Sequence, residues 1–315
     1  MAKKTPDPVG TLSIGNVITT ATTLYKSNFN RYFQVSVRAT GWMLAIVLSA
    51  FGLAVIGGIL SSLTKSWLIT IPLIVGWIAV SSYFLARHLT DRAVICRLAY
   101  QESIEQPETI SIATQQLQPR IWAFLRLSLL LGLYVFLIVL VSYFALALIV
   151  GGFFAIVYGL KLSPNSPPVA LLIGLFTIGM ILAWIVVLMR YYARWFVAEL
   201  PLAIESKGSA RISLRRSKEL SATFVNRITL ILTIAVGITL PITLFGSLPS
   251  LFGQVMSDPR ISTDSSTQTV GVFLIGVGFL ISTIGDLFVM PFWQVIKAII
   301  YCDLRNRQEG NDLIL

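Results

Sequence analysis

Six long stretches almost free of charged side chains constrain this chain more than any other feature of its sequence. Five of them lack Asp, Glu, Lys and Arg altogether, and the sixth is interrupted only by Asp286. They cover residues 39–64, 66–86, 127–160, 162–189, 228–257 and 265–296. A helix needs about 20 apolar residues to cross the hydrocarbon core of a bilayer, and each stretch is long enough. The sequence therefore predicts an all-α integral membrane protein with six transmembrane helices.

Composition supports one membrane domain rather than soluble domains. Hydrophobic residues make up 56% of the chain and charged residues 12%, whereas soluble domains have roughly 25% charged residues. We expect a single polytopic domain over residues 1–315. The spans are predicted at about 40–63, 67–86, 122–158, 168–189, 228–250 and 271–297.

The net charge of +10 raises the question of a nucleic-acid partner, and the distribution of the charge argues against one. Only Lys65, Lys161 and Arg260 follow an odd-numbered span, and all other Lys and Arg residues lie in the termini or after even-numbered spans. Positively charged segments stay on the cytoplasmic side of a membrane. The bias predicts cytoplasmic N and C termini and no nucleic-acid partner.

The third stretch is longer than one crossing requires, so it raises the alternative of two short spans that turn at Gly151 and Gly152. That alternative would move Arg190, Arg194 and the basic residues that follow them to the outside, against the charge bias. One long helix is therefore the better interpretation.

The order of polar and apolar segments suggests an internal repeat. The similar segments TLSIG, TISIA and RISLR each precede a pair of spans and contain Ser13, Ser111 and Ser213. Each pair of spans ends at a basic residue, namely Arg87, Arg190 or Lys297. Matching periods of about 100 residues predict three units at 11–90, 91–194 and 195–305. Each unit would hold a cytoplasmic amphipathic helix followed by two spans.

The third amphipathic segment carries a basic face. Arg211, Arg215 and Lys218 have the spacing i, i+4 and i+7, while Leu214 and Leu220 lie away from them. Such a helix can rest at a membrane surface and attract anionic lipid headgroups. The alternative is that these charges only fix the topology.

Asp286 is the sharpest single feature inside a predicted span. It precedes Lys297 by about 16 Å of helix, which places its carboxyl group near the middle of the membrane. A carboxyl group there is costly unless it is protonated, paired or in contact with water. The functional interpretation is a site for proton coupling or for a polar solute, and the alternative is a neutral acid in one interhelical hydrogen bond.

A search for catalytic chemistry finds no candidate set. His88 is the only histidine, Cys96 and Cys302 are isolated, and no nucleophile elbow, phosphate loop or zinc motif is present. The sequence predicts no enzyme activity, no metal and no cofactor. The glycines of GVGFLISTIGD are interpreted as points of close helix approach, and Trp77 and Trp184 as packing residues within the spans.

Three polar segments carry a family resemblance. The central segment contains Glu205, Arg216 and Ser217, and the opening LSIGNVITTATTLYKSNF begins the first unit. The C-terminal segment contains the motif residues Tyr301, Asp303, Arg305, Arg307, Glu309, Gly310 and Asp312. Together they resemble the membrane domain of some bacterial glycerophosphoryl diester phosphodiesterases, which also occurs as stand-alone six-span proteins.

The resemblance implies a plasma-membrane domain of bacterial type that is associated with lipid metabolism, without the separate barrel in which that family's catalysis takes place. From the spacing alone, Asp303 with Arg307 and Arg305 with Glu309 could form two exposed ion pairs on a helix that ends at Gly310. The leading hypothesis is a non-enzymatic protein that binds or organises lipid or supports lipid metabolism or translocation. The alternatives are a transporter or channel for a small solute that uses Asp286, and a scaffold for a membrane-protein partner.

Overall fold

The computed structural model describes residues 12–64, 68, 70–163, 166–205, 209–261 and 264–309. Within these residues, six helices are long and apolar enough to cross a membrane. They are α2 (Phe29–Thr64), α3 (Thr70–Ser103), α5 (Ile121–Gly159), α6 (Pro167–Ala193), α9 (Val225–Ser257) and α10 (Ser265–Glu309). The prediction of a helical protein with six membrane-length spans is confirmed. Helix α5 runs without a break through Gly151 and Gly152, so the third stretch forms one helix.

Four shorter helices accompany them: α1 (Ile14–Ser27), α4 (Ile110–Leu117), α7 (Glu199–Ile204) and α8 (Ala210–Ser221). Three of the four begin at a side-chain cap. Ser13 accepts from the N–H of Asn16 in α1 (3.1 Å), Thr109 from Ile112 in α4 (3.4 Å) and Ser209 from Ile212 in α8 (3.4 Å). Such caps satisfy amides that the first helical turn leaves free.

Only one of the three motif serines caps a helix. Ser13 caps α1, whereas Ser111 and Ser213 lie inside α4 and α8. Ser213 is buried, and its hydroxyl has no hydrogen-bond partner in the described part of the chain. The caps of α4 and α8 are Thr109 and Ser209, which stand before the motif serines because the hydroxyl that caps a helix must precede its first turn.

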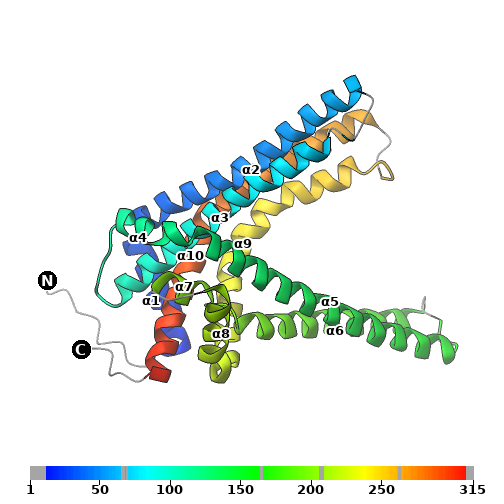
Figure 1. Ribbon diagram of the computed structural model, residues 1–315. Helices are drawn as coiled ribbons and strands as arrows, with labels where there is room; N and C mark the ends of the chain where they lie inside the picture. Colours follow the sequence, from blue (N-terminus) through cyan, green and yellow to red (C-terminus); the bar gives the residue numbers. More distant parts are fainter. Residues whose placement is uncertain are drawn as a thin grey trace.

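The long helices form two arms that diverge from a common base (Figure 1). Helices α2, α3, α9 and α10 make one arm, and the hairpin of α5 and α6 makes the other. We call the region where they meet the polar base. It comprises α1, α4, α7 and α8, together with residues 86–103 of α3 and 289–309 of α10.

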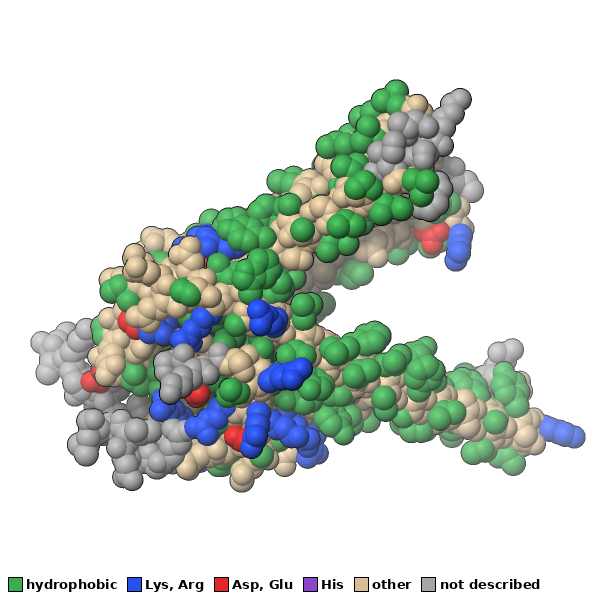
Figure 2. Space-filling view, viewed as in Figure 1, with side chains coloured by type: hydrophobic (Ala, Val, Ile, Leu, Met, Phe, Trp, Pro, Cys, Tyr) green, Lys and Arg blue, Asp and Glu red, His purple; other side chains and the backbone are tan. Residues whose placement is uncertain are grey.

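The arms expose apolar side chains along most of their length (Figure 2). The most apolar segments of α2, α5 and α6 bury no residue inside the protein, and Leu148, Phe51 and Phe273 are each about 70% exposed or more. A surface this apolar exceeds by far the patches that monomeric soluble proteins expose. Lipid is the solvent that such arms require.

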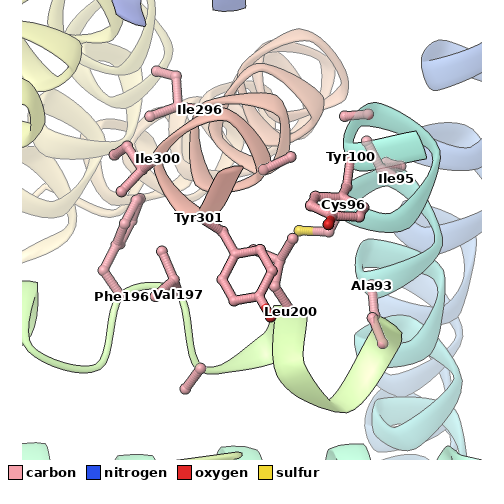
Figure 3. Packing of buried hydrophobic residues seen from close by; sticks show 14 of the residues in the cluster. Ala93, Ile95, Cys96, Tyr100, Phe196, Val197, Leu200, Ile296, Ile300 and Tyr301 are labelled. Atoms are coloured by element: carbon pink, nitrogen blue, oxygen red, sulfur yellow. The ribbon is translucent and has the colours of Figure 1, made fainter. Parts of the chain in front are cut away.

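The buried core lies in the polar base, where α3, α7 and α10 converge (Figure 3). Ile95, Leu200 and Ile296 are fully buried there. The rings of Tyr100 and Tyr301 meet edge to face, with centroids 5.6 Å apart. The polar base is thus the part of the molecule that packs like a globular protein.

Glycines set the close approach of α9 to α10. Gly271, Gly278 and Gly285 are spaced by seven residues on α10, and Gly246 and Gly253 share that spacing on α9. A Cβ atom on Gly278 would clash with the hydroxyl oxygen of Ser250 and lie 2.5 Å from the Ser250 backbone nitrogen. The predicted role is confirmed at Gly278 and Gly285 but not at Gly276, whose Cβ would meet nothing within 4 Å.

The other two hairpins are joined by the deep tryptophans. The indole N–H of Trp77 donates to Ser49 across α3 and α2 (3.1 Å), and that of Trp184 donates to Ser142 across α6 and α5 (2.9 Å). A polar ring atom inside an apolar span needs such a partner. The interpretation of both tryptophans as packing residues is confirmed, with a hydrogen bond added.

Candidate functional site

Helix α8 presents the predicted basic face to the outside of the polar base. Arg211, Arg215 and Lys218 are all exposed, and 83% of the Arg215 side chain is accessible. The opposite side of α8 is buried and includes Leu214 and Leu220. The sequence pattern therefore located the two faces of this helix correctly.

Serine hydroxyls fix how α8 lies against the end of α6. Ser217 and Ser221 both donate to the backbone carbonyl of Arg194, at 3.1 and 2.9 Å. This carbonyl belongs to the turn after α6, where an oxygen left free by the ending helix needs donors. The bonds hold α8 in one orientation, so its basic side chains stay outside.

One acidic residue shares the exposed face of α8. Glu219 accepts from Nε of Arg215 at 2.8 Å, in an i, i+4 pair that was not anticipated from the sequence. Ile212 is also exposed, at 54%. The outer surface of α8 thus combines three cations, one partly neutralising carboxylate and one apolar side chain.

Further exposed cations lie on α5 and at the end of α6, which pack against α8. Arg126 of α5 and Arg190 and Arg194 at the end of α6 are exposed. The space-filling view shows Lys and Arg side chains gathered over the polar base, in contrast to the apolar arms (Figure 2). The arrangement concentrates positive potential at one end of the molecule, where it can attract anions.

A buried ionic cluster lies inside the polar base and was missed in the sequence analysis. Glu199 of α7 lies 2.9 Å from Nζ of Lys297 in α10 and 3.9 Å from Arg92 in α3. With its amide oriented to suit these charges, Gln294 donates to Glu199 (3.2 Å) and accepts from Arg92 (3.1 Å). In the sequence, Arg92, Glu199 and Lys297 are three among several charged residues that follow the even-numbered spans, so no local pattern singles them out.

The cations of this cluster keep Glu199 ionised. Burial by itself would raise the pKa of the Glu199 carboxyl group, but the Lys297 ammonium and the Arg92 guanidinium more than offset it, so the pKa is lowered. Lys297 is only 4% exposed, and a buried charge is tolerated when it is paired and hydrogen-bonded. The cluster is fully partnered, which marks it as a structural joint of three helices.

A second buried carboxylate joins the two ends of the chain. Asp303 accepts from the backbone N–H of Leu12 (2.9 Å), from Arg227 (3.0 Å) and from Arg307 (3.1 Å). Arg227 and Arg307 also donate to the carbonyl oxygen of Leu12. The pair of Asp303 with Arg307 therefore forms, but the expectation that it is exposed is wrong, because Asp303 is 3% exposed and clasps α1 onto α10.

The other residues of the family motif also serve packing. Glu205 accepts from the Tyr301 hydroxyl group (3.2 Å) and lies 3.8 Å from Nε of Arg216. Arg305 donates to the hydroxyl group of Tyr100 (3.0 Å).

The far end of the motif is only partly described. Gly310, Asp312 and the side chain of Glu309 lie outside the described part of the chain. The pairing of Arg305 with Glu309 therefore stays a prediction.

Asp286 stands apart from these groups. It lies in α10 on the exposed side of the arm, and the described residues offer its carboxylate no hydrogen bond or ion pair. The interhelical hydrogen bond considered from the sequence does not form within the described part of the chain. No other acidic or basic side chain lies in the same part of α10, between residues 265 and 296.

The described residues hold no group of three or more His, Cys, Asp or Glu side chains that could bind a metal ion. His88 bonds through Nδ1 to the carbonyl oxygen of Ala39 (2.9 Å). Comparison of the chain with models of protein families, with curated proteins and with solved structures finds no match.

Proposed function

We propose that this protein binds anionic membrane lipid at its polar base through the basic face of α8, and that it organises lipid or supports lipid metabolism without catalysing a reaction. The observation that carries the proposal is the exposure of Arg211, Arg215 and Lys218 on a helix whose other side is locked into the polar base. The helix connects through a short turn to a membrane-length helix, α9. Its basic face thus stands near the level of lipid headgroups.

The orientation follows from the charge bias. The tips of the arms carry Lys161 and Arg260, whereas the polar base collects most other cations (Figure 2). Because basic segments remain in the cytoplasm, the polar base and both termini would face inward in a plasma membrane. Cytoplasmic leaflets carry the negative surface potential that attracts such a face.

Three related units would build the polar base. Helix α4 packs on α3 and α8 packs on α7, so each of these short helices contacts the segment that ends or follows the preceding pair of spans. Helix α1 completes the series by packing on α10, the last helix of the chain. The capped starts at Ser13, Thr109 and Ser209 and the two tryptophan–serine bridges recur at similar periods.

The buried ionic cluster fits the same scheme. Arg92 follows the first pair of spans, Glu199 the second and Lys297 ends the third, so each unit gives one charge to the centre. In this scheme, α1 closes the three units into a ring by packing on α10. The residues of the family motif, which resembles the glycerophosphoryl diester phosphodiesterase membrane domain, then lie at contacts between units. We propose that the chain is related to that family.

The expected binding energy is modest and depends on charge. Each basic residue near an anionic surface contributes roughly 1 kcal/mol, and Arg215 shares part of its charge with Glu219. Exposed Ile212 would add apolar contact with the acyl boundary, as in interfacial helices. Together these terms favour anionic over zwitterionic lipid by on the order of tenfold to a hundredfold.

Native mass spectrometry of the purified protein tests this proposal. The variant Arg211→Ala/Arg215→Ala/Lys218→Ala is compared with wild type after exposure to phosphatidylglycerol and phosphatidylcholine. A matched control removes the same charge from the opposite loops, as Lys65→Ala/Lys161→Ala/Arg260→Ala. We expect the first variant, but not the control, to retain less bound phosphatidylglycerol than wild type. Equal retention in all three proteins would refute the role of α8.

A second candidate function rests on Asp286. A carboxyl group without a partner in the described residues of a membrane span is costly, and such residues often mark ion or substrate pathways. The candidate is a transporter or channel for a small solute. It is the weaker of the two, because no second ionisable side chain accompanies Asp286 in the membrane-spanning part of α10.

A further inference from the structure

An apolar groove of about 250 Å³ lies between α5 and α6, next to the polar base. Val135, Ile138 and Val139 line its α5 side. Stacked rings of Tyr134 and Trp195, with centroids 5.7 Å apart, stand at one end. The hydrogen bond from Trp184 to Ser142 joins the helices at the other end. Tyr134 and Ser142 are eight residues apart on α5, so the groove between these two contacts is roughly 12 Å long.

The rim of the groove near the polar base is aromatic and cationic. Tyr191, Tyr192 and Trp195 line it from the end of α6. The guanidinium carbon of Arg194 lies 5.3 Å from the ring centroid of Tyr191. Arg190 is exposed one helical turn away. Neither arginine has a carboxylate within ion-pair distance in the part of the chain that the structure describes.

These surroundings limit what can occupy the groove. An apolar groove offers water few polar partners, so water is a poor occupant. A second copy that docked through the same face would bring Arg190 and Arg194 of both copies together, and α5 and α6 contain no Asp or Glu to compensate. Amphipathic aromatic rings at the end of a span match the boundary between acyl chains and headgroups.

We propose that the groove binds one acyl chain of an anionic phospholipid whose headgroup contacts Arg190 and Arg194. The proposal deepens the proposed function and rests on it, because it names a second point of lipid contact on the same side of the membrane. Arg194 connects the two points: its side chain borders the groove, while its carbonyl oxygen accepts the hydroxyl groups of Ser217 and Ser221 in α8. One lipid-rich surface would then extend from α6 to α8.

Quenching of Trp195 by brominated lipid tests the groove directly. The protein is reconstituted into phosphatidylcholine vesicles that contain phosphatidylglycerol as the minor lipid, with bromine on the chains of one lipid or the other. The difference in fluorescence between wild type and Trp195→Phe isolates Trp195 from the other tryptophans. The phenylalanine ring keeps the stack with Tyr134, so we expect this variant to fold.

We expect brominated phosphatidylglycerol to quench the Trp195 signal several times more effectively than brominated phosphatidylcholine at equal mole fraction. Arg190→Gln/Arg194→Gln should abolish the preference, because each cation contributes about fivefold to the affinity for an anionic headgroup, and Lys161→Gln/Arg260→Gln should preserve it. Val139→Phe, which fills the groove without changing charge, should reduce quenching by both lipids.

Two results would overturn the proposal. Equal quenching by the two lipids, unchanged by Arg190→Gln/Arg194→Gln, would mean ordinary surrounding lipid. Quenching by neither lipid would mean that protein, such as a second copy, covers the groove. The triple alanine variant of α8 separates the two proposals: it should leave the Trp195 preference intact, so either site can fail in its own assay while the other stands.

Discussion

The backbone N–H of Leu12 donates to the carboxylate of Asp303 at 2.9 Å, across a separation of 291 residues. This bond joins the start of the first helix to the last helix of the chain. Two guanidinium groups, from Arg227 and Arg307, hold the same carboxylate. One buried acidic side chain therefore links the start of α1 to α10, and the contribution of this link can be measured.

Asp303→Asn should loosen α1 from α10. The amide can still accept from Leu12, but two guanidinium groups that are 19% exposed lose their counter-charge, at a cost of about 3 kcal/mol. Hydrogen exchange should rise in residues 14–27 before the arms are affected. Asp264→Asn, at an exposed helix start, should change hydrogen exchange little. Equal protection of α1 in the two variants would contradict the role of Asp303 in holding α1 against α10.

Gly278→Ala should destabilise the pair of α9 and α10. The added methyl group would lie 2.5 Å from the backbone nitrogen of Ser250, so the helices must separate, and overpacking of this kind costs roughly 1–3 kcal/mol. Gly276→Ala is the matched control, because that position has open space and alanine favours the helix. Thermal unfolding in detergent should show a lower midpoint for Gly278→Ala alone.

Glu199 should make stability depend on pH. Its pKa is lowered in the folded protein from the ordinary value of 4.5, so its stabilising effect is complete above that value and is lost as pH falls through the folded pKa. Glu199→Gln should therefore cost about 3 kcal/mol at neutral pH, and the difference from wild type should shrink in acid. Unfolding at pH 7 and below 4.5 measures this, with the exposed Glu105→Gln as control.

Asp286→Asn tests the transport alternative. If the protein binds lipid without moving a solute, the variant should retain its lipid and be at least as stable as wild type, since a neutral amide is less costly in a membrane than a carboxylate. Solute or proton flux into vesicles should be absent from both proteins. A flux that is present in wild type and abolished by Asp286→Asn would favour the transporter instead.

The sequence was sufficient for the helical class, the number of membrane-length spans and the two faces of α8. These features depend on local patterns, since an uncharged run of 20 residues or a cation at i, i+4 and i+7 is legible in one segment. The single helix across Gly151 and Gly152 was predictable for a different reason: the charge bias excluded the alternative.

The contacts inside the polar base were not predictable. Arg92, Glu199 and Lys297 come from three separate segments, and nothing local distinguishes a buried cation from one that only fixes topology. Asp303 was expected in an exposed pair with Arg307 because helical spacing gives the neighbour but not the burial. The caps Thr109 and Ser209 were not predicted, because the three segments were aligned by the serine motifs that follow these residues.

Photo-crosslinking from α8 shows directly what its basic face contacts. A benzophenone amino acid at Ile212, which is 54% exposed beside the basic face, is activated in native membranes, and the adducts are identified by mass. We expect adducts with anionic phospholipid that disappear when Arg211, Arg215 and Lys218 are replaced by alanine. Adducts with one discrete protein would contradict this expectation and favour a scaffold, and lipid adducts unaffected by the alanine substitutions would show that the basic face selects no lipid.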